Sequence, residues 1–186
     1  MNKSLLAGRY AKALLTYALE VGEAEMVYPL LRELGRTLRP SATVDRELLI
    51  TNPTLPEGER SRAVVALMGE AVPESLRRFV DLVFSHNRES LLGEMARAYI
   101  RLYRRHKGIT FVRITSAEEL NEELLCKICE VVRLHKGGEV EVETIVDKGL
   151  IGGFVLRVDG EVMDGSVRSA IERIRQQFVS KNKTLV

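Results

Sequence analysis

The chain has 186 residues, of which 45% are apolar, and its 28 basic and 26 acidic residues give a net charge of +2. This size and apolar content suffice for one or two small domains with real cores, while the charge by itself does not indicate a nucleic-acid or anionic-membrane partner. No apolar run approaches the ~18–20 residues of a membrane span, and Arg9 and Lys12 interrupt any signal-peptide core. We therefore expect a soluble, cytosolic protein that meets a membrane only through a partner.

Residues 1–107 are predicted to form a helical bundle. Apolar residues recur at helical spacing with short breaks at glycine, proline or asparagine, and no convincing alternation of period two occurs. Short breaks between antiparallel neighbours are typical of a compact bundle. Six short helices are predicted, whose apolar residues span Leu6–Val21, Val27–Leu38, Val44–Leu49, Ala63–Met68, Leu76–Phe84 and Leu92–Tyr103.

Two of these helices carry more apolar surface than a bundle needs. The first has two apolar stripes, and the fifth is apolar over most of its circumference. A surface helix normally needs one apolar stripe, so a helix with more is either central in the bundle or keeps a face for a partner. The residue pattern leaves both alternatives open. The residues concerned are Leu6, Ala7, Tyr10, Ala11, Ala13, Leu14, Tyr17 and Ala18, then Leu76, Phe79, Val80, Leu82, Val83 and Phe84.

Residues 108–186 are predicted to form a small α/β domain with the order strand, helix, three strands, helix. Ile109–Thr115 is rich in β-branched residues, and a helix with a stripe from Leu120 to Val132 follows it. The next three strands, Glu139–Glu143, Leu150–Val158 and Glu161–Met163, are expected to form a meander, in which a two-residue turn joins the second and third. The fold class is therefore α+β.

The C-terminal helix of this domain is expected to begin after Asp164-Gly165-Ser166, whose side-chain oxygens can cap it. Its apolar residues recur at helical spacing from Val167 to Phe178.

The sequence offers little reactive chemistry. Cys126 and Cys129 are the only Cys-x-x-Cys pair, but two helical turns precede them, and no second Cys/His pair has zinc-ligand spacing. No nucleophile stands in a recognised motif, and no phosphate-binding Gly-x-x-x-x-Gly-Lys loop is present. We expect no cofactor, no metal and no catalytic residue, which leaves a redox role for the cysteines as a minor alternative.

A second alternative is RNA binding by the C-terminal domain. Gly149-Leu150-Ile151-Gly152 matches the Gly-x-x-Gly of KH domains. In those domains the loop lies between two helices and usually carries polar or basic residues, whereas here Leu-Ile lies between two predicted strands. The adjoining strand also carries glutamates, so we expect no nucleic-acid partner.

Two stretches of the sequence resemble one family. Arg9-Tyr10-Ala11-Lys12-Ala13-Leu14 near the start is one, and the run from Ile145 through Leu150–Val158 to Asp164-Gly165-Ser166-Val167-Arg168 is the other. Together they resemble the delta subunit of F-type ATP synthases, the family of the mitochondrial oligomycin-sensitivity-conferring protein. The resemblance covers the whole chain.

The resemblance implies a non-catalytic connector in the peripheral stalk, which resists rotary torque during proton-driven ATP synthesis. Residues 1–107 would bind the N-terminal helix of an alpha subunit of the catalytic headpiece, in a groove between the first and fifth helices. Residues 108–186 would bind the C-terminal end of the b-type stalk subunit. The protein would lie on the cytoplasmic, or equivalent matrix or stromal, face of the membrane without inserting into it. By position, the groove residues would be Tyr10, Ala13, Leu14, Val80, Val83 and Phe84.

Overall fold

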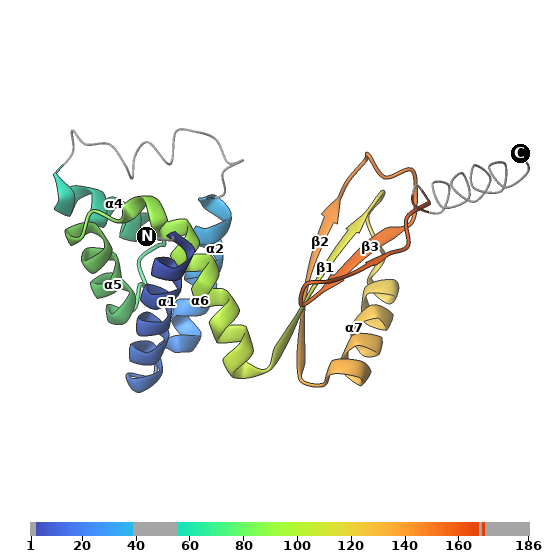
Figure 1. Ribbon diagram of the computed structural model, residues 1–186, viewed down its shortest axis with the longest axis horizontal. Helices are drawn as coiled ribbons and strands as arrows, with labels where there is room; N and C mark the ends of the chain where they lie inside the picture. The colour runs from blue at the N-terminus through green and yellow to red at the C-terminus, as the bar shows by residue number, and fades with distance from the viewer. Residues whose placement is uncertain (1–2, 39–55, 168, 170–186) are drawn as a thin grey trace, which may run out of the picture. The chain divides into compact units, whose positions relative to one another are not determined.

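The computed structural model describes residues 3–38, 56–167 and 169, and the chain divides into two compact units, Met1–His106 and Lys107–Val186. The first unit is helical, and the second is built on a β-sheet (Figure 1). The boundary expected from the sequence, after Lys107, lies one residue further along the chain than this one.

Among its described residues, the first unit forms five α-helices and a short 3-10 helix. The helices expected near the first, second, fourth, fifth and sixth apolar stretches are confirmed, while the stretch Val44–Leu49 lies outside the described residues. The elements are α1 (Lys3–Glu20), α2 (Ala24–Thr37), α4 (Glu57–Leu67), α5 (Glu74–Ser85), η1 (Glu89–Leu91) and α6 (Leu92–Lys107).

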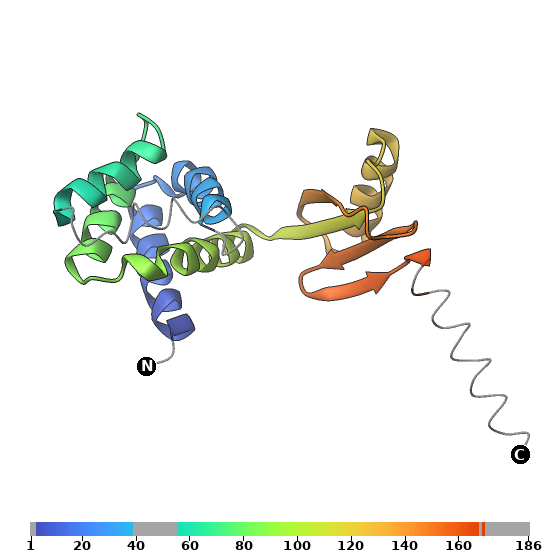
Figure 2. The same ribbon diagram turned by 90° about the horizontal axis from the view of Figure 1, so that it is seen from above.

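The core of this unit is built by one face of each helix. Contacts join α5 to both α4 and α1, and the three helices lie side by side (Figure 1 and Figure 2). Burying such aliphatic and aromatic side chains stabilises the unit by roughly 1.5–3 kcal/mol each. The largest fully buried side chains of the unit are Val27, Leu31, Val64, Leu76, Val80, Val83, Phe84, Leu92, Met95 and Tyr99.

Polar contacts fix α4 against its neighbours. Ser61 on α4 donates a hydrogen bond to the carboxylate of Asp81 on α5. Arg60 forms an ion pair of 2.8 Å with Glu89 of η1, and the two side chains are only 10% and 14% exposed. The Arg60 guanidinium also lies over the ring of Phe84, 5.6 Å from its centroid. A buried charge is tolerated when it is paired in this way.

The end of α1 determines how α5 begins. Gly22, with φ +73°, ends α1 in a Schellman motif, in which its N–H and that of Glu23 donate to Leu19 and Ala18. Glu23 is thereby placed so that its carboxylate accepts the backbone N–H of Ser75 at 2.9 Å. The residue at the N-cap of α5 is a proline without a side-chain oxygen, so Glu23 supplies the cap from the turn between α1 and α2.

The second unit contains a four-stranded sheet covered on one face by a helix. Its elements are β1 (Ile109–Ser116), α7 (Glu122–Lys136), β2 (Glu139–Val146), β3 (Phe154–Val158) and β4 (Glu161–Asp164). The strand order is β2-β1-β3-β4, with β1 parallel to β2 and the other pairs antiparallel. Val132 of α7 packs on Val112, Ile114 and Val158, which form the core of this unit.

The predicted meander is wrong, because β2 does not pair with β3. Helix α7 returns the chain so that β2 lies parallel to β1, and β3 then pairs with the other edge of β1. The strand predicted over Leu150–Val158 is also shorter, since its first four residues lie in the loop that crosses from β2 to β3. The glutamates of β2 are not all solvated, because Glu143 forms a 2.8 Å ion pair with Arg113 of β1.

Two local predictions in this unit are confirmed. Asp159 and Gly160 form the turn between β3 and β4 with positive φ at both residues, +47° and +100°. After β4, Asp164 Oδ1 accepts the N–H of Ser166, and Ser166 Oγ accepts the N–H of Ser169. These are the capping contacts expected at a helix start. The remainder of the predicted C-terminal helix lies outside the described residues.

The cap on α5 makes a pH-dependent prediction. The hydrogen bonds from Ser75 hold the pKa of the Glu23 carboxyl below its ordinary value of 4.5. Because the pKa is lower in the folded state, this carboxylate stabilises the fold at pH values above its ordinary pKa. The contribution is lost as the pH falls through the lowered pKa. We expect Glu23→Gln to lower the melting temperature of the helical unit at pH 7.

The measurement is thermal unfolding followed by circular dichroism across pH. The difference between Glu23→Gln and the wild type should shrink as the solution becomes acidic. Glu25→Gln, in the first turn of α2, is the control because its carboxylate is not the one that caps α5. A difference between Glu23→Gln and the wild type that stays constant at every pH would contradict this role.

Candidate functional site

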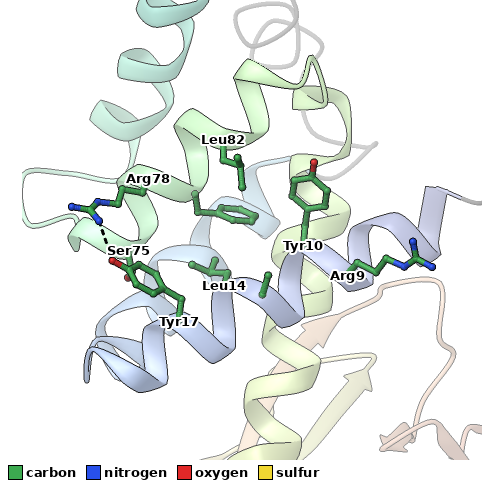
Figure 3. A pocket seen from close by; sticks show the side chains of 9 residues that line it. Arg9, Tyr10, Leu14, Tyr17, Ser75, Arg78 and Leu82 are labelled. Atoms are coloured by element: carbon green, nitrogen blue, oxygen red, sulfur yellow. Dashed lines mark hydrogen bonds between the residues drawn. The ribbon is translucent and has the colours of Figure 1, made fainter.

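An open groove of about 400 Å³ runs between α1 and α5 on the surface of the helical unit. Figure 3 shows it from close by, with side chains from the two helices facing each other across it. Its lining is mostly apolar, with arginine, serine and tyrosine groups among it. The lining residues are Arg9, Tyr10, Ala13, Leu14 and Tyr17 on α1, and Ser75, Arg78, Phe79 and Leu82 on α5.

The floor and the walls of the groove differ in exposure. Leu14 and Phe79 are 3% and 6% exposed and form the floor, whereas Leu82 is 46% exposed and Ala13 is also exposed. The ring of Tyr10 meets that of Phe79 edge to face, with 6.5 Å between centroids. Such pairs contribute about 0.5–1.5 kcal/mol beyond the area they bury, so the groove has a rigid aromatic wall.

Arginines lie at the ends of the groove. Arg78 donates to the hydroxyl of Tyr17 at 3.3 Å and forms a 2.9 Å ion pair with Glu74 one turn earlier on α5. The hydrogen bond to Glu74 raises the pKa of the Arg78 guanidinium, which therefore stays charged. Near the other end, the Arg88 guanidinium lies 5.5 Å from the centroid of the Tyr10 ring. These contacts hold both tyrosine rings in place.

Half of the residues predicted for the groove line it. Tyr10, Ala13 and Leu14 all lie on its α1 side. Their spacing along α1 places them on one face, because residues three and four apart are neighbours on a helix.

Val80, Val83 and Phe84 do not line the groove. Val80 and Val83 are 0% exposed and Phe84 is 1% exposed, because they belong to the face of α5 that packs into the bundle core. At about 100° per residue, Leu76, Val80 and Val83 fall within about 60° of one another around the helix. This face is the central one, so the assignment of these three residues to the groove is corrected.

On α5, the groove is instead lined by four residues that the prediction did not select, namely Ser75, Arg78, Phe79 and Leu82. Tyr17 on α1 was also missed. A helical projection would have separated Leu82 from the core face, since it lies about 100° from Val83. No sequence pattern would have identified Ser75 or Arg78, because polar residues at those positions are equally typical of a solvated face.

The other candidate chemistry finds little support. Cys126 and Cys129 are both unbonded, on α7, and no group of three or more metal-ligating side chains gathers among the described residues. The Gly149–Gly152 segment joins β2 to β3, and Asp147 Oδ1 accepts the N–H of Gly149. A KH-type site needs that loop between two helices, so the geometry argues against the RNA-binding alternative.

Comparison with known proteins identifies the family. The family model described as "ATP synthase delta (OSCP) subunit" matches residues 6–178. The chain belongs to this family. Among relatives, ATP synthase subunit delta of Phocaeicola vulgatus is 37% identical over 189 residues, with all of both chains covered. That of Rubrobacter xylanophilus is 32% identical over 173 residues, covering 92% of this chain and 95% of the relative.

A solved structure agrees with the fold. A chain in the cryo-EM structure of the Toxoplasma gondii mitochondrial ATP synthase hexamer superposes with a TM-score of 0.69 at 22% identity. The match covers 94% of this chain and 97% of that one. It supports the fold of a delta/OSCP subunit, with a helical N-terminal region and a small sheet domain.

Membership of this family establishes what kind of subunit the chain is and which complex its partners belong to. A delta/OSCP subunit is a non-catalytic, structural subunit of F-type ATP synthase, and its partners are other subunits of that complex. None of the described helices combines the length and the apolar character that crossing a bilayer requires.

The two faces of α5 predict effects of very different size for two neighbouring substitutions. Val83→Ala should lower the free energy of unfolding by about 2 kcal/mol, because it leaves a cavity in the core. Leu82→Ala should change it by less than about 0.5 kcal/mol, because the side chain lies at the surface of the groove. Urea denaturation followed by circular dichroism measures both. Equal losses for the two variants would mean that Leu82 is part of the core.

Proposed function

We propose that this subunit ties the catalytic headpiece to the peripheral stalk by receiving a helix of the alpha subunit in the groove between α1 and α5. The groove is the observation that carries the proposal. It presents a half-exposed leucine, an exposed alanine and two tyrosine rings beside a buried floor, which is the form of surface that receives an amphipathic helix.

The proposed occupant is the N-terminal helix of an alpha subunit. Its apolar stripe would cover Leu82 and Ala13 and lie over Leu14 and Phe79 at the floor. Each well-buried apolar anchor contributes roughly 1.5–3 kcal/mol, so a few of them suffice for a slowly dissociating contact. The groove residues in this proposal are Tyr10, Ala13, Leu14, Tyr17, Phe79 and Leu82, and Val80, Val83 and Phe84 support them from the core.

We assign the stalk contact to the second unit. It has a separate core and so can hold a second partner independently, which the mechanical role requires. The C-terminal end of the b-type subunit would bind there, and the two contacts together would hold the headpiece still against rotary torque. The subunit would lie on the cytoplasmic, or equivalent matrix or stromal, face of the membrane.

The groove predicts a binding defect with an intact fold. Leu82→Asp should weaken binding of a synthetic alpha N-terminal peptide at least about tenfold, because it removes an apolar anchor and leaves a carboxylate to be desolvated. Isothermal titration calorimetry with the full chain measures the affinity, and circular dichroism should show an unchanged helix content.

Leu67→Asp is the matched control. Leu67 lies on α4 in the same unit, is 53% exposed, and does not line the groove, so its substitution should leave the affinity unchanged. Leu82→Asp should also bind the b-type subunit as tightly as the wild type does. Equal loss of peptide binding in both variants would refute the proposal that the groove is the peptide-binding site. Loss of stalk binding in Leu82→Asp would refute the division of roles between the two units.

A further inference from the structure

We infer that the groove selects an acidic amphipathic helix, through one arginine near each of its ends, and that Glu74 competes with the bound helix for one of them. This inference rests on the proposed function and adds the charge of the partner to it. Two arginines and no acidic residue belong to the described lining.

The arginines are placed to act at separate points. Figure 3 shows Arg78 beside Tyr17 and Ser75, and Arg9 beside Tyr10 at the opposite end. Tyr10 and Tyr17 are seven residues apart on α1, which corresponds to about 10 Å at the rise of a helix. A helix lying along α1 would therefore meet the two cations at positions about two turns apart. Carboxylates seven or eight residues apart would face both arginines.

The state of each arginine in the free protein supports this assignment. Among the residues that the structure describes, Arg9 has no ion-pair or hydrogen-bond partner. Arg9 is exposed and lines the groove, and its long side chain allows the guanidinium to reach a ligand at the rim. Arg88 lies over the Tyr10 ring near this end and adds positive charge there.

Arg78 is already paired, and its pair is weak. The side chains of Arg78 and Glu74 are 66% and 59% exposed, and exposed pairs of this kind contribute little because solvent screens their charges. A carboxylate on the bound helix can therefore share or replace Glu74 as the partner of Arg78. Removing the Glu74 charge should leave Arg78 more available to the incoming helix.

The test compares two peptides on the full chain by isothermal titration calorimetry. One is the alpha N-terminal peptide, and the other is the same peptide with its Asp and Glu replaced by Asn and Gln. At low salt, Arg9→Gln and Arg78→Gln should each lower the affinity for the acidic peptide about two- to fivefold. Neither variant should change the affinity for the amide peptide. Glu74→Gln should raise the affinity for the acidic peptide and leave that for the amide peptide unchanged. Arg62→Gln, an exposed arginine of α4 outside the lining, is the control and should change neither.

Salt gives a second readout. Raising the ionic strength from about 0.05 M to about 0.5 M should remove most of the difference between the two peptides, because exposed charges are screened. The charge selection is refuted if both peptides bind the wild type equally well, or if the arginine variants lower the affinity for both peptides equally. In either case the proposal that the groove binds the helix is not contradicted. If neither peptide binds the wild type, the proposed function fails and this inference fails with it.

Discussion

The packing of one face of α5 into the bundle core is the constraint on which the site depends. Leu76, Val80 and Val83 are completely buried on that face, and Phe84 extends it. With this face fixed, Phe79 and Leu82 are left on the flank that turns toward α1. The groove is therefore a consequence of the core, because the same helix that closes the bundle also presents a second apolar strip to the surface.

The position of α5 along α1 depends on polar contacts rather than on burial. The Schellman motif at Gly22 turns the chain so that Glu23 can cap the first turn of α5. Further along α5, Asp81 accepts a hydrogen bond from Ser61 of α4. Apolar packing is not directional, whereas hydrogen bonds to a helix terminus fix its position. These contacts keep the walls of the groove in register before any partner binds, which reduces the cost of ordering them on binding.

Much of this could be predicted from the sequence, and the failures have physical causes. The helices of the bundle, the turn at Asp159-Gly160 and the cap at Ser166 follow from local periodicity and turn chemistry, which short windows contain. The strand order could not be predicted in this way. The insertion of β1 between β2 and β3 depends on long-range pairing, whereas the sequence shows only that three strands follow one another.

Only part of the groove lining could be predicted from the sequence, for a similar reason. The apolar surplus on the first and fifth helices pointed to the two helices that line the groove, and Tyr10, Ala13 and Leu14 are among its lining residues. The surplus alone did not tell which apolar residues of α5 face the core and which face the groove. That distinction depends on the rotation of the helix, which is set by packing against α4 and α1.

The claim that a partner's helix fills this groove is tested most directly by intermolecular nuclear Overhauser effects. The full chain, labelled at its methyl groups, would be studied with the unlabelled alpha N-terminal peptide. The account predicts contacts from the peptide to the methyl groups of Ala13, Leu14 and Leu82. Contacts instead to exposed side chains elsewhere, such as Leu67 on α4 or Val131 on α7, with none to the groove residues, would contradict it.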